Sequence, residues 1–344
     1  MIFLDWLQSN AVHLVATLLL LGVLIIVHEW GHFLAFRRFK VPVEVFAVGF
    51  GPAVWRRPMA GGAEFRLCPI PLGGYVRPDE AAARAARPPA KIAIALAGPA
   101  MNLVAAAVFL IGLALWQGEV HAAPEVGKVL ADSPAGRAGL QTGDRVVAVE
   151  GEEITTFEAL VAAVQGRAGL ITELTIERGA ERLTVTVVPE AQDGGSVGRI
   201  GVMHSGATWS QRLGPLEAIR YGVRETVDLT ARTVGGFVQF VTRQVDASAV
   251  GGPIMIFQMA TQAAGFGAAA LVHFMAVISV ALFVFNLLPV PPLDGGHIVF
   301  GCIEAVRGKS LPKRAEEWVQ QGAFVLLIVF ILFVSYNDIL RILR

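Results

Sequence analysis

Long apolar runs dominate the chain, and stretches of mixed polarity separate them. Four of the runs, at about residues 12–36, 92–116, 271–290 and 319–335, are long enough to cross a bilayer, because a membrane helix needs about 20 apolar residues. The pattern therefore predicts a polytopic α-helical membrane protein with four transmembrane helices.

The connection between the first two runs is broken into short blocks by Gly and Pro between residues 43 and 75. These blocks predict short strands, and hence a β-hairpin region close to the membrane. Such a region could offer an exposed edge to which an extended peptide adds as a strand. A loop that only packs against the helices fits the pattern equally well, so both interpretations stay open.

Residues 125–190 have the pattern of a compact soluble domain. A strand, a Gly-rich turn and a second strand that closes at Gly143 and Asp144 are followed by helical spacing at residues 155–165 and by a hairpin with Gly179 in its turn. We therefore expect an α+β domain between the second and third spans.

Beyond this domain, apolar residues from Leu216 to Val241 recur every three or four positions, with arginines between them. The spacing predicts an amphipathic helix, either at the outer membrane surface or packed against the α+β domain. We divide the chain into four parts, namely residues 1–116 with two spans and the hairpin region, 117–200 with the α+β domain, 201–270 with an amphipathic membrane-surface segment, and 271–344 with the last two spans.

Composition agrees with a membrane protein, because 54% of the residues are hydrophobic and only 16% are charged. The formal net charge is zero, so nothing indicates a nucleic-acid partner. The two cysteines, Cys68 and Cys302, lie far apart in the sequence and form neither a disulfide framework nor a CxxC metal motif.

Charges near the spans predict the orientation, because cytoplasmic loops of membrane proteins are rich in Lys and Arg. The first connection, residues 37–91, carries ten basic residues against four acidic ones, whereas the segment before the first span has no basic residue. We therefore expect the N-terminus outside, the hairpin region in the cytoplasm and the α+β domain outside.

The first span carries the candidate chemistry. His28 and His32 are four residues apart and so lie on one face of a helix, with Glu29 beside them. Ionisable residues are costly inside an apolar run and indicate a functional site. HExxH on a helix is the metal-binding half of a zinc hydrolase site. Because the two histidines lie near the inner end of the first span, we expect this site toward the cytoplasmic side.

The third span ends in NLLPVPPLDGG, where Asp294 is the sole acidic residue between Asp246 and Glu304. We expect Asp294 at the cytoplasmic end of this helix, level with the two histidines. Two His and one carboxylate, with a fourth position left for water, make a catalytic zinc site. His297 lies three residues further on, but the set is already complete without it.

The second span contains Gly98, Pro99 and Asn102. Proline bends a membrane helix, and Asn102 needs a hydrogen-bond partner in a hydrocarbon environment. These residues either serve helix packing or shape the metal cavity, and the sequence leaves both open.

Together, HEWGH, PLGGYV, GPAMN, SPAGRAGLQTGDRVVAVEG and NLLPVPPLDGG cover nearly the whole chain. With these motifs the sequence resembles the site-2 protease family of intramembrane zinc metalloproteases, in particular the bacterial RseP-type regulators of intramembrane proteolysis. The α+β domain resembles a PDZ domain, and one such domain is present where the best-known RseP-type proteins carry two in tandem.

The resemblance implies one Zn²⁺ per chain, with His28, His32 and Asp294 as ligands, Glu29 as catalytic base and Asn286 near the substrate. It also implies that Gly73, Gly74 and Tyr75 belong to a membrane-associated β-hairpin that holds the substrate strand. The implied location is the bacterial cytoplasmic (inner) membrane. The implied substrates are single-span membrane proteins, such as anti-sigma factors or remnant signal peptides, and a peptide C-terminus is a candidate ligand of the PDZ-like groove.

Two other classes of protein compete with the protease. A membrane scaffold with a PDZ-like module and an idle metal site would bind partners without cleaving them. A metal transporter would also place His and Asp in its spans, but it should carry further polar residues in the second and fourth spans, and AFVLLIVFILFV in the fourth has none.

Overall fold

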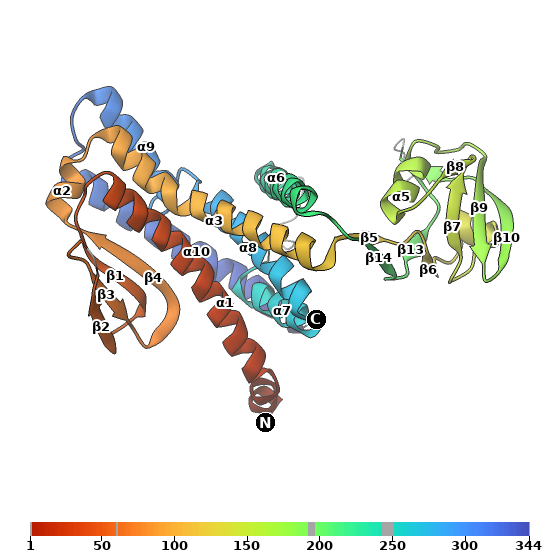
Figure 1. Ribbon diagram of the computed structural model, residues 1–344, viewed down its shortest axis with the longest axis horizontal. Helices are drawn as coiled ribbons and strands as arrows, with labels where there is room; N and C mark the ends of the chain where they lie inside the picture. The colour runs from red at the N-terminus through yellow and green to blue at the C-terminus, as the bar shows by residue number, and fades with distance from the viewer. Residues whose placement is uncertain (1, 60, 192–196, 243–250, 344) are drawn as a thin grey trace. The chain divides into compact units, whose positions relative to one another are not determined.

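The computed structural model describes residues 2–59, 61–191, 197–242 and 251–343. The chain forms two compact units, of which the first contains residues 1–113 and 219–344 and the second contains Ala114–Ala218. Figure 1 shows the elements of each unit along the chain.

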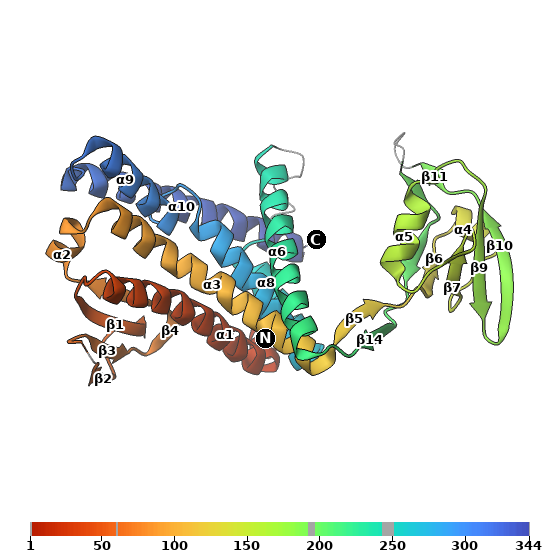
Figure 2. The ribbon, with the colours of Figure 1, turned by 45° about the horizontal axis from the view of Figure 1, so that its top comes forward.

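Four helices of the described chain are long and apolar enough to cross a membrane, as the sequence predicted. The apolar stretches are Leu18–Arg38, Pro88–Gln117, Ala268–Asn286 and Lys313–Arg341. They lie in α1 (Ile2–Arg38), α3 (Pro88–Gln117), α8 (Ala268–Asn286) and α10 (Lys313–Leu343). Figure 2 shows α1 and α3 side by side.

Small residues bring these helices close together. A Cβ atom on Gly31 of α1 would lie 2.3 Å from the carbonyl oxygen of Ala97 in α3, so the two backbones touch there. Ala106 and Ala276 are fully buried where α3 packs against α8. Close packing through small side chains is typical of membrane helices.

A four-stranded sheet follows α1. Its strands are β1 (Val43–Phe50), β2 (Trp55–Pro58), β3 (Glu64–Leu67) and β4 (Ile70–Pro78), in the order β2-β3-β1-β4. Strand β1 pairs in parallel with β3 and antiparallel with β4. Phe33 of α1 and Phe46 of β1 are buried together, which fixes the sheet against the helix and leaves β4 at its edge.

The second unit has its own apolar core, in which Leu160, Val146, Leu174 and Ile176 are nearly inaccessible to solvent. Its main sheet has the order β10-β9-β7-β8. The elements are β5 (Glu119–Ala122), β6 (Val126–Val129), α4 (Pro134–Arg137), β7 (Arg145–Val149), β8 (Glu152–Glu153), α5 (Phe157–Gln165), β9 (Thr172–Arg178), β10 (Glu181–Val187), β11 (Glu190–Ala191), β12 (Gly198–Arg199), β13 (Val202–His204) and β14 (Thr208–Gln211).

Residues 202–204 and 208–211, which the sequence analysis assigned to the amphipathic segment, form strands of this second unit. Strand β13 pairs with β6, and β14 pairs with β5. The long helix α6 (Pro215–Val241) follows. Its Gly222 lies against Ile111 of α3, and the ring of Phe237 lies 5.9 Å from that of Phe285 in α8. The rest of the expected segment includes residues 243–250, which lie outside the described residues.

The shorter helices are α2 (Glu80–Ala85), α7 (Pro253–Gly265) and α9 (Asp294–Arg307). The expectation that Asp294 ends the third span differs from the structure, because α8 ends at Asn286 and Asp294 is the first residue of α9. Pro291 and Pro292 stand between the two helices, and proline lacks the N–H that an α-helix requires.

Candidate metal centre

The two histidines of α1 lie on one face of the helix, one turn apart. Their Nε2 atoms are 3.1 Å from each other, and each residue is 8% exposed. This arrangement follows from the four-residue spacing, since positions i and i+4 of a helix stand one above the other.

Asp294 reaches the same point from the start of α9. Its Oδ2 lies 3.1 Å from His28 Nε2, and its Oδ1 lies 3.2 Å from His32 Nε2. The following glycine is required for this approach, because a Cβ atom on Gly295 would lie 2.1 Å from the carbonyl oxygen of Leu288. The LDGG motif therefore lets the chain turn back on itself and direct the carboxylate at the histidines.

The donor set fits zinc. Zn–N bonds of about 2.0–2.1 Å at tetrahedral angles place ligand atoms roughly 3.3 Å apart, and the nitrogen and oxygen atoms here are separated by 3.1–3.2 Å. In the described part of the chain, these three residues form the group of His, Cys, Asp and Glu side chains that could hold a metal ion. Two imidazoles and one carboxylate leave a coordination position open, as a hydrolytic site requires.

Helix α3 supports the histidines from behind. His32 donates its Nδ1–H to the carbonyl oxygen of Ile94 over 2.8 Å, and His28 Nδ1 lies 3.1 Å from Asn102 Nδ2. A Cβ atom on Gly98 would lie 2.2 Å from His32 Nε2 and 2.8 Å from His28 Nε2. Only a glycine backbone fits against the imidazole pair at that position.

Glu29 lies between the histidines and the sheet. The backbone N–H of Val76 in β4 donates to Glu29 Oε2 over 3.1 Å. Gly74 lets β4 lie close to β1, because a Cβ atom at that position would lie 2.8 Å from the Ala47 carbonyl oxygen, and it also lies beside Glu29. The edge strand therefore touches the carboxylate that we expect to act as the base.

A cavity of about 840 Å³ opens from this centre. Glu29 and the three expected metal ligands line it, together with Tyr75, Asn286 and His297. Among the described residues, the group of side chains that could hold a metal ion consists of His28, His32 and Asp294, and His297 lines the cavity outside that group. Gly73 lies against the ring of Phe50 and not in the lining of this cavity.

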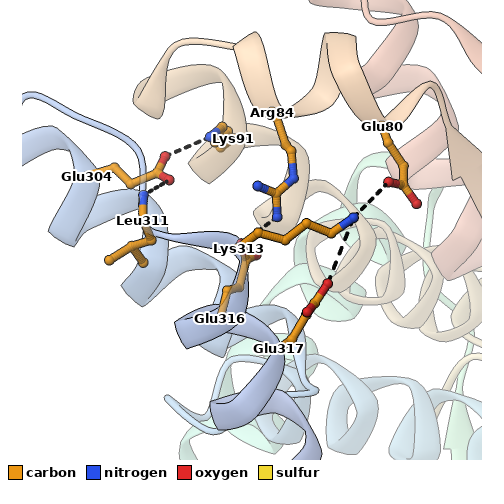
Figure 3. Close-up of polar contacts among 8 residues, drawn as sticks. All are labelled: Glu80, Arg84, Lys91, Glu304, Leu311, Lys313, Glu316 and Glu317. Atoms are coloured by element: carbon orange, nitrogen blue, oxygen red, sulfur yellow. Dashed lines mark hydrogen bonds and ion pairs between the residues drawn. The ribbon is translucent and has the colours of Figure 1, made fainter.

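The cavity extends to a cluster of ion pairs that joins α2 and the start of α3 to α9 and the start of α10 (Figure 3). The pairs are Lys91 with Glu304 at 2.7 Å, Arg84 with Glu316 at 3.4 Å, and Lys313 with Glu80 at 3.6 Å. Burial of Glu304 would raise its pKa, but bonds from Lys91 and from the Leu311 N–H hold the pKa below its usual value. Glu304 is therefore ionised at neutral pH and ties the two sides together.

Several contacts of the site were not predicted from the sequence. The Ile94 carbonyl and the Val76 N–H are backbone groups, which every residue carries, so no residue type indicated them. Ser279 donates its hydroxyl to the backbone carbonyl of Asn102 over 2.8 Å. A buried Ser in the third span was the one available signal for this contact.

Comparison with known proteins identifies the family. The model of peptidase family M50 matches residues 16–330. Relatives named as zinc metalloproteases include proteins from Brucella suis biovar 1, which is 36% identical over 94% of this chain and 93% of the relative, and from Mesorhizobium japonicum, which is 35% identical over 95% and 98%. A relative with the same kind of name from Clostridium perfringens is 34% identical over 95% of this chain and 98% of its own.

Among solved structures, the PDZ domain of an SdrC-like protein from Listeria monocytogenes is similar to part of the chain. The match has 18% sequence identity and a TM-score of 0.22, and it covers 24% of this chain and 88% of that domain. The family assignment stands on the sequence comparisons alone. Because the family model spans nearly the whole chain and the relatives align over almost their full length, this multi-pass membrane protein belongs to peptidase family M50, the site-2 proteases, and is a zinc-dependent intramembrane metalloendopeptidase.

Proposed function

We propose that His28, His32 and Asp294 hold the catalytic zinc ion and that Glu29 is the general base. The observation that carries the proposal is the convergence of two Nε2 atoms and one carboxylate within 3.1–3.2 Å, beside a second carboxylate that lines the same cavity. Hydrolysis of a peptide bond by a zinc enzyme requires such a set of metal ligands and a carboxylate beside it that acts as the base.

A bound zinc ion would supply Lewis-acid chemistry, by polarising the scissile carbonyl and activating a water molecule for attack. Glu29 accepts a proton from that water and returns it to the nitrogen of the leaving amine. The Val76 N–H holds one oxygen of Glu29, so the carboxylate keeps its orientation while the other oxygen exchanges the proton.

The proposed substrate is the transmembrane segment of a single-span membrane protein. A helix in a bilayer has its carbonyl groups locked in hydrogen bonds, so the segment must unwind before it can be cleaved. Strand β4 is the edge of its sheet and carries Gly74 and Tyr75 next to Glu29. Pairing of the unwound segment with this edge would replace the hydrogen bonds lost on unwinding.

We also propose an orientation of the chain in the membrane. We infer a bacterial inner membrane with the N-terminus outside, because basic residues are concentrated in the connection between α1 and α3. The metal centre then lies toward the cytoplasm, and the unit Ala114–Ala218 lies outside. We assign this unit a PDZ-like role, with a peptide C-terminus as its ligand.

The direct test is cleavage of a single-span model substrate in lipid vesicles by wild type and by Glu29→Gln, with zinc analysis of both proteins. We expect cleavage by wild type and a loss of at least about 100-fold in the variant, with zinc near one per chain in both. Equal cleavage by both proteins would remove Glu29 from the chemistry. A zinc-bound wild type that cleaves no single-span substrate would contradict the proposed substrate class.

A further inference from the structure

We propose that Asn102 is a positioning residue of the zinc centre. Its side-chain Oδ1 accepts a hydrogen bond from His28 Nδ1–H, and this bond fixes the ring in the tautomer whose Nε2 is free to bind zinc. The inference rests on the proposed ligand set and extends it to a residue that touches neither the metal ion nor the substrate.

Asn102 is fully buried in α3, and its side chain faces one of the expected ligands. The amide nitrogen lies 3.1 Å from His28 Nδ1, and the amide oxygen has no hydrogen-bond partner in the described part of the chain. A buried amide is costly in an apolar environment unless it makes hydrogen bonds. Among the described residues, the amide has its hydrogen-bond contact with the imidazole of His28.

The chemistry of imidazole decides which end of the amide must face the ring. A neutral histidine carries one proton, so a ring that binds zinc through Nε2 carries that proton on Nδ1. Nδ1 is then a donor, and an amide nitrogen cannot accept its hydrogen bond. Rotation of the amide by about 180° brings Oδ1 to the ring, and because the two ends of an amide are nearly equal in size, their hydrogen-bond partners decide which end faces it.

His32 shows the same arrangement already complete. Its Nδ1–H donates to the carbonyl oxygen of Ile94, which can only accept. Ile94, Gly98 and Asn102 follow one another at intervals of four residues, and each meets the histidine pair. One face of α3 therefore provides an acceptor for each imidazole, and Gly98 between them leaves room for both rings. Metal-binding histidines generally have such an acceptor for the second ring nitrogen.

The test compares zinc affinity in the full-length protein, purified in detergent, by competition with a chelator. Asn102→Asp keeps an acceptor at the same place, whereas Asn102→Leu keeps the size and removes it. Gly112→Ala is the matched control, because Gly112 lies in the same helix and a Cβ atom there would meet nothing within 4 Å. The visible spectrum of the cobalt-substituted protein gives a second readout of ligand geometry.

We expect the Leu variant to bind zinc about 10- to 100-fold more weakly than wild type and to show an altered cobalt spectrum. The Asp variant and Gly112→Ala should bind zinc as wild type does. If Asn102→Leu does not fold, Asn102→Ala takes its place.

Two results would overturn the inference. One is wild-type zinc affinity in Asn102→Leu, and the other is equal weakening in the Asp and Leu variants, which would indicate a packing role. His28→Ala separates this failure from failure of the ligand set. Loss of zinc in His28→Ala with full affinity in Asn102→Leu contradicts only the role of Asn102, whereas full affinity in His28→Ala contradicts the proposed ligands and the inference with them.

Discussion

Single atoms decide how closely α3 approaches the imidazoles of the metal centre. The absence of a side chain on Gly98 matters as much as the presence of His28 and His32, because any Cβ atom there would overlap both rings. The sequence marked the histidines through their spacing and the carboxylate through its isolation in an apolar run. It marked Gly98 and Asn102 only as unusual residues in a span, since their purpose depends on a helix 66 or more positions away from the histidines.

Replacement of Gly98 by Ala should damage the centre without damaging the helix. The new Cβ atom would lie 2.2 Å from His32 Nε2, so the ring must move. A displacement of about 1 Å at a catalytic group can cost about 100-fold in rate, and we expect a loss of this order in cleavage together with weaker zinc binding. The cleavage rate is measured with a model substrate, and zinc binding is measured by competition with a chelator.

Gly112→Ala is the control for this substitution, because Gly112 lies in the same helix and a Cβ atom there would meet nothing within 4 Å. Both changes raise helix propensity by about 1 kcal/mol, so a difference between them reports the clash. Wild-type cleavage and zinc affinity in Gly98→Ala would show that the imidazoles are placed elsewhere.

At the scale of elements, helix periodicity predicted more than strand pairing did. The four spans and the helical spacing of 155–165 depend on neighbours a few residues apart, and α1, α3, α8, α10 and α5 are present. The pairing of β14 with β5 joins residues 86 to 92 positions apart. No local pattern indicates such a pairing, so residues 208–211 appeared to belong to the next segment.

The break between α8 and α9 has a similar explanation. Three prolines at positions 289, 291 and 292 were visible, yet they did not show where the next helix begins. The turn depends on close contacts of Gly295 and Gly296 with the backbone of residues 287–291. Those contacts bring Asp294 to the histidines from a helix of its own.

One ion pair holds two elements of the second unit together and should make its stability depend on pH. Burial of Asp144 would raise its pKa, but two hydrogen bonds from the Arg178 guanidinium, at 2.7 and 2.8 Å, and one from the Gln141 N–H hold the pKa below the usual 3.8. A carboxyl group with a lowered pKa adds stability above its unfolded pKa. That stability is lost as the pH falls through the folded value.

Asp144→Asn should therefore lower the free energy of unfolding of this unit by about 1–3 kcal/mol at pH 7, and the difference from wild type should shrink well below pH 3.8. Urea unfolding of the full chain, monitored through hydrogen exchange in β9 and β10, measures the difference in free energy of unfolding at pH 7 and at low pH. Glu177→Gln is the control, since Glu177 forms an exposed pair with Arg182 at 3.3 Å, and exposed pairs contribute little. An equal difference at both pH values would show that the Asp144 charge is not responsible.

On the scale of the whole molecule, the metal centre draws on three parts of the chain. The histidines come from α1, their support comes from α3, and Asp294 comes from α9. The three proposed ligands could be selected from the sequence because each is a polar residue in an apolar segment. The supporting backbone groups and the cavity that reaches the ion pairs at α10 were not predictable, because they arise only when the segments are packed together.

X-ray absorption at the zinc edge of the purified protein tests the central claim most directly. We predict one zinc per chain, with nitrogen and oxygen neighbours at about 2.0–2.2 Å, and loss of part of this signal in Asp294→Ala. Sulfur neighbours at about 2.3 Å would assign the metal to the cysteines. An unchanged spectrum in Asp294→Ala, or no zinc in wild type, would contradict a centre built from His28, His32 and Asp294.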